Sequence, residues 1–132
     1  MNDHKMMFEK LRENLKGDLF TDDLHRILYA TDGSAYRELP LAVLRPKDKE
    51  DVKKVIEFAR SEKSSVIPRG GGTSLAGQVV GPGIVVDVSK YMTGIIEFNP
   101  EEKWVVVEPG VILAELNKFI EPHGMQFGPE TS

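Results

Sequence analysis

The stretch Pro68-Arg69-Gly70-Gly71-Gly72-Thr73-Ser74-Leu75-Ala76-Gly77-Gln78 dominates this sequence of 132 residues. It holds four glycines within eight residues, together with two hydroxyl side chains, an amide and an arginine. Glycine adopts positive φ and lets a ligand come close to the backbone. Exposed N–H groups beside hydroxyls form an anion cradle, and the arginine adds a fixed positive charge. The stretch therefore predicts a loop that binds a nucleotide diphosphate.

The residues before this loop predict a βαβ unit. A short strand over 41–44 is followed by a helix over 49–62 that Asp48 can cap. A second strand over 65–68 runs directly into the glycine loop. This order favours parallel strands with a right-handed crossover, and ligands of such units bind where strands end. The buried stripe expected on the helix consists of Val52, Val55, Ile56 and Ala59.

The sequence ahead of this unit, residues 1–38, predicts a helical lead-in to a domain over 39–132. Helices are expected over 4–16 and 21–29, and a polar, turn-rich segment follows them. The lead-in has too few apolar positions to form a domain of its own.

The sequence after the loop predicts the beginning of a second, mixed unit. A β-branched strand over 83–88 is expected first, and then an antiparallel hairpin from 95–98 and 103–108. A helix over 111–121 follows. The last residues read as a loop with no closing element, so we expect the domain to be truncated at its C-terminus.

Composition narrows the function classes. The net charge is −4 and no basic stripe appears, so nucleic acid is not an expected partner. The absence of cysteine leaves no thiolate metal or iron–sulfur ligand in this chain. The three histidines lack ligand spacing, and neither a metal site nor a catalytic residue is predicted. No apolar run is long enough for a transmembrane helix, which makes the cytoplasm the expected compartment, with peripheral membrane association of the full protein left open.

Two well-known phosphate motifs fail on the glycine loop. In the dinucleotide pattern G-x-G-x-x-G, counted from Gly70, the third glycine position holds Leu75. Gly72 and Gly77 have the spacing of an ATP-binding phosphate loop, but Gln78 replaces its lysine. A strand rather than a helix is expected after the loop, so backbone N–H groups and hydroxyls must do the binding.

Three segments together resemble a known family: 69–77, Ile84-Val85-Val86-Asp87-Val88-Ser89, and Val107-Glu108-Pro109-Gly110-Val111. They look like the PCMH-type FAD-binding domain of the vanillyl-alcohol oxidase family. The resemblance covers residues 25–132 and is nearest to FAD-linked D-2-hydroxyacid dehydrogenases of the glycolate oxidase and D-lactate dehydrogenase kind. The lead-in over 29–43 is similar to that of large members that also carry iron–sulfur domains.

The resemblance implies an α+β fold with a small βαβ subdomain and the start of a second mixed α/β subdomain. FAD would lie between them, held without a covalent bond because Thr73 stands where some members have the histidine that links the flavin. The residues implied in cofactor binding are Arg69, Gly70, Gly71, Gly72, Thr73, Ser74, Gly77, Gln78, Pro129, Thr131 and Ser132.

The activity implied is oxidation of a D-2-hydroxyacid, of the lactate, glycolate or 2-hydroxyglutarate type, to the 2-oxoacid. The substrate would be bound by a C-terminal domain outside this chain, and any iron–sulfur cluster would also lie outside it. Three alternatives stay open: oxidation of a sugar or aldehyde, a non-catalytic module that binds nucleotide phosphate, and a structural module. The oligomeric state is not predicted.

Several side chains allow two interpretations. Arg69 can bind phosphate or pair with an acid such as Glu108. Thr73 and Ser74 can face the ligand or hydrogen-bond their own loop. Tyr36 and Arg37 can abut the cofactor or a neighbouring domain. Trp104 is expected to pack across its hairpin.

Overall fold

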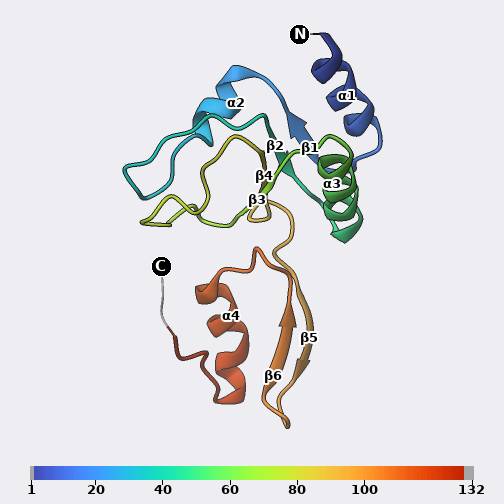
Figure 1. Cartoon of the computed structure of the whole chain (residues 1–132). Coiled ribbons are helices and arrows are strands. Elements are labelled where there is room, and N and C mark those ends of the chain that lie inside the picture. The colour runs from blue at the N-terminus through green and yellow to red at the C-terminus, as the bar shows by residue number, and fades with distance from the viewer. Residues whose placement is uncertain (1, 130–132) are drawn as a thin grey trace.

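A four-stranded sheet in the order β1-β2-β4-β3 forms the centre of the upper unit in Figure 1. This computed structural model describes residues 2–129, and side chains from Met6 onward. Strands β2 (Ala42–Arg45) and β3 (Val66–Arg69) both run parallel to β4 (Ile84–Asp87). The parallel arrangement is confirmed, but the two strands of the βαβ unit are not neighbours. All four residues of β4 are buried, which suits the central place between them.

Strand β1 (Asp18–Phe20) is the element that the sequence did not predict. It pairs antiparallel with β2, and Leu19 lies opposite Leu44. Three residues are too few to show an alternating pattern. Gly17 permits this pairing, because a β-carbon on it would lie 2.1 Å from the Arg45 carbonyl oxygen.

The lead-in helices take two different positions. Helix α1 (Asn2–Glu13) is shorter than predicted, and its Phe8 and Leu11 are buried in the same core as Leu44. Helix α2 (Asp23–Leu28) begins after its N-cap Asp22, and its own apolar side chains remain exposed. The lead-in therefore shares the hydrophobic core of the sheet.

Helix α3 (Lys49–Ser61) packs against the sheet and begins at the predicted cap, Asp48. Its buried line is Asp51, Val55 and Ala59, at a spacing of four residues. Val52 is half-buried, and Ile56 is 52% exposed, so the predicted stripe is wrong there. Ile56 follows Val55 by one residue, which turns it about 100° around the helix and away from the sheet.

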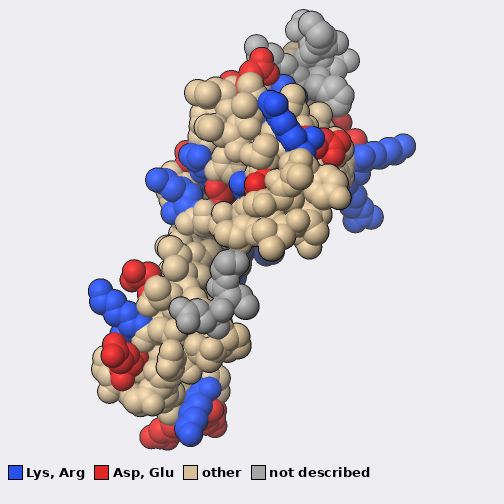
Figure 2. All heavy atoms as spheres, turned by 90° about the vertical axis from the view of Figure 1, so that its left-hand side faces the viewer, with Lys and Arg blue, Asp and Glu red and all other residues tan. Residues whose placement is uncertain are grey.

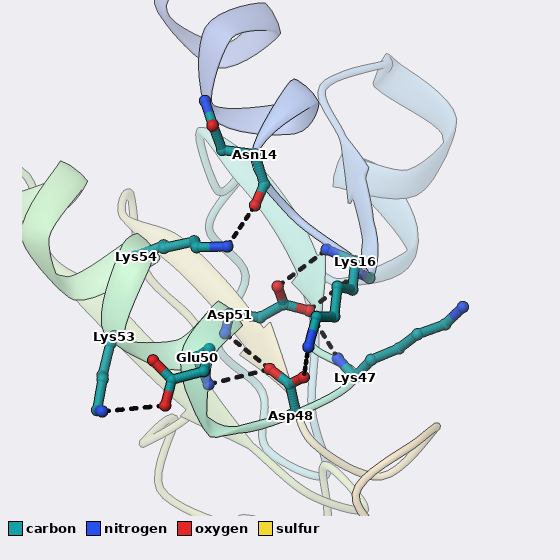
Figure 3. Close-up of polar contacts among 9 residues, drawn as sticks. Asn14, Lys16, Lys47, Asp48, Glu50, Asp51, Lys53 and Lys54 are labelled. Carbon is teal, nitrogen blue, oxygen red and sulfur yellow. Dashed lines mark hydrogen bonds and ion pairs between the residues drawn. The ribbon is translucent and has the colours of Figure 1, made fainter.

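The Asp51 carboxylate joins α3 to the turn between α1 and β1 (Figure 3). It is fully buried and accepts backbone N–H groups from Lys16 and Gly17 at 2.9 Å and from Lys47 at 3.0 Å. Figure 3 also shows the Lys16 ammonium beside Asp48, at 2.6 Å. A buried charge is tolerated here because several donors satisfy it.

The lower unit of Figure 1 contains a hairpin and a helix. Strands β5 (Ile95–Asn99) and β6 (Trp104–Val107) pair antiparallel, as predicted. Helix α4 (Leu113–Ile120) buries Leu116 and Ile120, and a 3-10 turn, Glu121–His123, ends it. Ile112 and Phe119, although apolar, are exposed. Trp104 lies opposite Asn99, and its indole N–H donates to Glu102 at 2.8 Å.

The turn at Glu108-Pro109-Gly110, between β6 and α4, packs against the segment 88–94 that links the two units. The Glu108 carboxylate accepts the Gly94 N–H at 2.7 Å, and the Gly110 N–H donates to the Met92 carbonyl at 2.8 Å. A β-carbon on Gly110 would lie 2.2 Å from the Val88 carbonyl oxygen, so only glycine allows this approach. Within the described residues, we find no helix with the length and hydropathy needed to cross a membrane.

Candidate cofactor-binding loop

The glycine loop leaves the sheet at the carboxyl end of β3, where the ends of β2 and β4 also lie. Arg69 is the last residue of β3, and it lies opposite Asp87, the last residue of β4. Arg45 ends β2 on the other side of β4. Figure 1 shows the loop after β3 extending beside the segment that follows α2. The sheet thus delivers two arginines and one carboxylate to the edge from which the loop departs.

Two glycines of the loop are required by the fold itself. Gly72 has φ +69° and Gly77 has φ +74°, a region that side chains rarely adopt. A β-carbon on Gly72 would lie 2.4 Å from Nη2 of Arg69, and one on Gly77 would lie 2.8 Å from Cδ2 of Tyr36. These positions need glycine whether or not a ligand binds.

The other two glycines have no such requirement. Gly70 and Gly71 are exposed and do not have positive φ. A β-carbon on Gly70 would meet nothing within 4 Å, and one on Gly71 would meet only the Thr73 methyl group, at 3.7 Å. Neither conformation nor packing among the described residues demands glycine here. The open backbone fits a group that approaches the N–H donors from outside the chain.

The turn-rich segment over 31–37 supports the loop from the protein side. The Gly33 N–H donates to the Gly72 carbonyl at 3.0 Å, and the Arg69 guanidinium donates to the Thr31 carbonyl at 2.8 Å. The ring of Tyr36 lies against Gly77. Tyr36 thus contacts the glycine loop, while most of its side chain stays exposed.

Asp32 organises this supporting segment. Its Oδ1 accepts the backbone N–H of Ser34 at 2.8 Å and the Ser34 hydroxyl at 2.5 Å, as in a tight Asx turn. The Ser34 hydroxyl is also the main reason why the pKa of Asp32 is lowered. Its other oxygen, Oδ2, is buried.

Ser74 and Gln78 hold the far part of the loop together. The Ser74 hydroxyl bonds to the Gln78 side chain and accepts the Gln78 N–H at 3.1 Å. One of the two interpretations of Ser74, a hydroxyl engaged with its own loop, therefore describes this structure. These bonds join the two ends of the segment 74–78, which contains Gly77. They do not involve the N–H groups of Gly70 and Gly71.

Arg69 lies on an aromatic ring instead of pairing with Glu108. Its guanidinium carbon is 5.1 Å from the ring centroid of Tyr29, and Glu108 binds Gly94, as described above. The Tyr29 hydroxyl donates to Asp87 at 2.5 Å and accepts from Nε of Arg45 at 3.0 Å. Burial, reinforced by the Asp87 bond, raises the pKa of Tyr29. Sequence reasoning missed Tyr29 and Asp87 as partners of the loop, because 58 positions separate them.

The remaining predicted site residues lie near the end of the chain. Pro129 is exposed, and the hydrogen bonds of the described residues do not link it to the glycine loop. Thr131 and Ser132 lie outside the described residues. Figure 2, which views the molecule from the left of Figure 1, shows acidic and basic side chains interspersed on that face, without a continuous basic stripe.

The fold and the loop define a class of protein. A mixed sheet with three parallel strands opens into an exposed glycine loop, and an antiparallel hairpin unit follows it. This is the architecture of an α+β domain that binds a nucleotide cofactor. The family model described as "FAD binding domain" matches residues 40–132. The chain belongs to this family of FAD-binding domains.

Curated relatives agree with that assignment. The chain is 45% identical over 124 residues to the D-2-hydroxyglutarate dehydrogenase of Escherichia coli (strain K12), a match that covers 92% of the chain and 12% of that enzyme. It is 42% identical over 93 residues to the mitochondrial cytochrome-type D-lactate dehydrogenase of Kluyveromyces lactis, covering 67% and 16%. The chain thus spans a small part of the length of these relatives.

Solved structures share the fold at low sequence identity. Alkyldihydroxyacetonephosphate synthase superposes with a TM-score of 0.78 at 20% identity, over 91% of this chain and 25% of that one. p-Cresol methylhydroxylase superposes with a TM-score of 0.73 at 18% identity, over 94% of this chain and 26% of that one. Both support the PCMH-type α+β fold that the sequence predicts.

Proposed function

We propose that this chain is the FAD-binding part of an oxidoreductase that converts a D-2-hydroxyacid to its 2-oxoacid, and that it holds FAD without a covalent bond. The observation that carries the proposal is the pair Gly70 and Gly71. Their backbone is open and exposed, although nothing among the described residues requires glycine there. A pyrophosphate that approaches this backbone closely would explain why both positions are glycine.

The chain's own contribution is to bind and orient the cofactor. Backbone N–H groups of the loop over 70–73 donate to the pyrophosphate oxygens, and charge-assisted bonds of this kind are strong. Gly72 and Gly77 keep the loop in the required conformation. Thr73 offers no imidazole for a covalent flavin link. When bound, FAD supplies the two-electron oxidation of the substrate's CH–OH carbon, a reaction that the protein orients and tunes.

Among hydroxyacids we favour D-2-hydroxyglutarate. The relatives from Haemophilus influenzae and Escherichia coli that carry this name match 91% and 92% of the chain at 42% and 45% identity. The cytochrome-type D-lactate dehydrogenases match less of the chain or match it less closely: that of Kluyveromyces lactis is 42% identical over 67% of the chain, and that of Arabidopsis thaliana is 29% identical over 93%. The residues that recognise the substrate belong to the whole protein, and we name none in this chain.

A test starts from the protein that carries this chain, produced at its natural length. We expect a flavin spectrum, release of the flavin into the supernatant on acid precipitation, and reduction of an artificial electron acceptor with D-2-hydroxyglutarate but not with the L-isomer. Titration of apoprotein should give tight binding of FAD, weaker binding of ADP and poor binding of FMN.

Other outcomes would select the alternatives. Flavin that stays in the acid precipitate contradicts the non-covalent site. Equal binding of ADP and FAD without turnover favours a nucleotide-phosphate module. If the protein oxidises an aldehyde or a sugar and does not oxidise any D-2-hydroxyacid, the proposed substrate class is wrong.

A further inference from the structure

We propose that Arg69 holds the glycine loop from the protein side instead of binding the pyrophosphate, and that Tyr29 is the positioning residue that fixes Arg69. The inference rests on the proposed FAD site and assigns roles to two residues within it.

The contacts of Arg69 point inward. Its Nη1 donates to the Thr31 carbonyl at 2.8 Å, and its Cζ lies 5.1 Å from the centroid of the Tyr29 ring. The Gly72 backbone comes so close that a β-carbon there would lie 2.8 Å from Cζ and 3.0 Å from Nε. The guanidinium thus touches the supporting segment, the ring and the loop together. It links the middle of the loop to the body of the domain.

Tyr29 is itself held firmly. Its side chain is 9% exposed, and its hydroxyl joins Asp87 and Arg45 at 2.5 and 3.0 Å. Asp87 is 6% exposed, and its second oxygen accepts the Ser89 N–H at 2.9 Å and the Ser89 hydroxyl at 2.6 Å. The hydroxyl cannot move without breaking bonds to buried polar groups, which is costly, and the ring packs with Val43 and Val85 in a buried cluster that restrains its rotation. Its face is therefore a fixed platform for a cation.

The topology explains why one tyrosine can do this. Strands β2, β4 and β3 end side by side and deliver Arg45, Asp87 and Arg69 to one edge. Tyr29, at the C-terminal cap of α2, lies among all three. Asp87 is opposite Arg69 in the strand register, but its carboxylate bonds to Tyr29 and Ser89 and lies 4.0 Å from Arg45. Arg69 therefore does not pair with Asp87 and lies on the face of the Tyr29 ring instead.

The experiment uses the protein at its natural length and measures FAD affinity of the apoprotein by quenching of flavin fluorescence. Tyr29→Phe keeps the ring face and removes the hydroxyl, so affinity should stay within about threefold of wild type while the melting temperature falls. Tyr29→Leu removes the face, and affinity should fall about tenfold. The FAD affinity of Arg69→Met should fall by a similar factor. The affinity of Arg69→Lys should be no higher than that of Arg69→Met, because lysine lacks the planar guanidinium group.

The double variant Tyr29→Leu/Arg69→Met provides the sharpest comparison. If Tyr29 acts through Arg69, the double variant binds FAD no more weakly than Arg69→Met alone. Arg60→Met, an exposed arginine of α3, is the control and should match wild type. Losses that multiply in the double variant, or an Arg69→Lys affinity equal to wild type, overturn the inference. A wild-type protein that binds no FAD overturns the proposed function instead.

Discussion

Gly77 lies against the ring of Tyr36 so closely that a β-carbon on it would come within 2.8 Å of Cδ2. The same glycine has φ +74°. The contact joins the far end of the glycine loop to the turn-rich segment that supports it. Gly77 therefore has two reasons to be glycine, its backbone conformation and its close packing against Tyr36. The cost of each in stability can be measured separately.

Substitution of Gly77 by alanine should destabilise the chain by about 1–3 kcal/mol, since a side chain at positive φ is strained and the β-carbon meets Tyr36. Gly124→Ala is the matched control, because Gly124 has φ +70° with nothing within 4 Å of a β-carbon. It should cost about 1 kcal/mol, for the conformation alone. Urea-induced unfolding measures both values. Equal losses would mean that Tyr36 adds no steric restriction.

Gly71→Val should behave in the opposite way. Its position is open, so the free energy of unfolding should stay within about 0.5 kcal/mol of wild type, while the protein at its natural length loses its flavin. Gly128→Ala, at another open and exposed position, should leave both properties unchanged. The visible absorbance of the flavin gives the readout. Normal flavin in Gly71→Val would show that the cofactor does not approach this backbone.

Asp51→Ala should be among the most destabilising single changes in the sheet unit. It leaves the N–H groups of Lys16, Gly17 and Lys47 without their acceptor, at a cost of about 3 kcal/mol. Glu50→Gln, which disturbs only an exposed pair with Lys53, should change stability by less than about 0.5 kcal/mol. Chemical denaturation of the two variants makes the comparison. A mild effect of Asp51→Ala would mean that water replaces the carboxylate.

The stability of the chain should fall in acid. Hydrogen bonds from His25 lower the pKa of Asp22, and the Lys16 side chain lowers that of Asp48, each below the ordinary value of 3.8. Because the folded pKa is the lower one, the unfolded chain binds more protons, and stability rises with pH through this range. The contribution is complete above about pH 5 and is lost as pH falls through the folded values.

Asp48→Asn tests this pH dependence. Asparagine keeps a capping oxygen for the N–H groups of Glu50 and Asp51 but removes the titrating charge. Unfolding measured between neutral pH and about pH 3 should show a shallower loss of stability in the variant than in wild type. If stability falls equally steeply with pH in the variant and in wild type, Asp48 does not contribute to the acid sensitivity.

Much of the fold follows from local patterns. Asp48 and the apolar spacing behind it predict α3, and β-branched runs predict β4 and the hairpin to within about two residues, as such patterns generally do. The loop was identifiable because glycines at this density have few other uses. Strand β1 escaped prediction because its three residues become a strand only by pairing with β2. Ile56 was misplaced because its exposure depends on how α3 lies on the sheet.

The amino-acid sequence by itself determined that the chain has a βαβ unit with a glycine loop at its end, a hairpin unit after it, and a threonine where a flavin-linking histidine would stand. Only the tertiary structure divided the glycines into Gly72 and Gly77, which the fold requires, and Gly70 and Gly71, which it leaves open. Only the tertiary structure placed Arg69 on Tyr29 and Tyr29 on Asp87. The physical reason is that propensity and periodicity act between near neighbours, whereas these contacts join residues that the sheet brings together from distant parts of the chain.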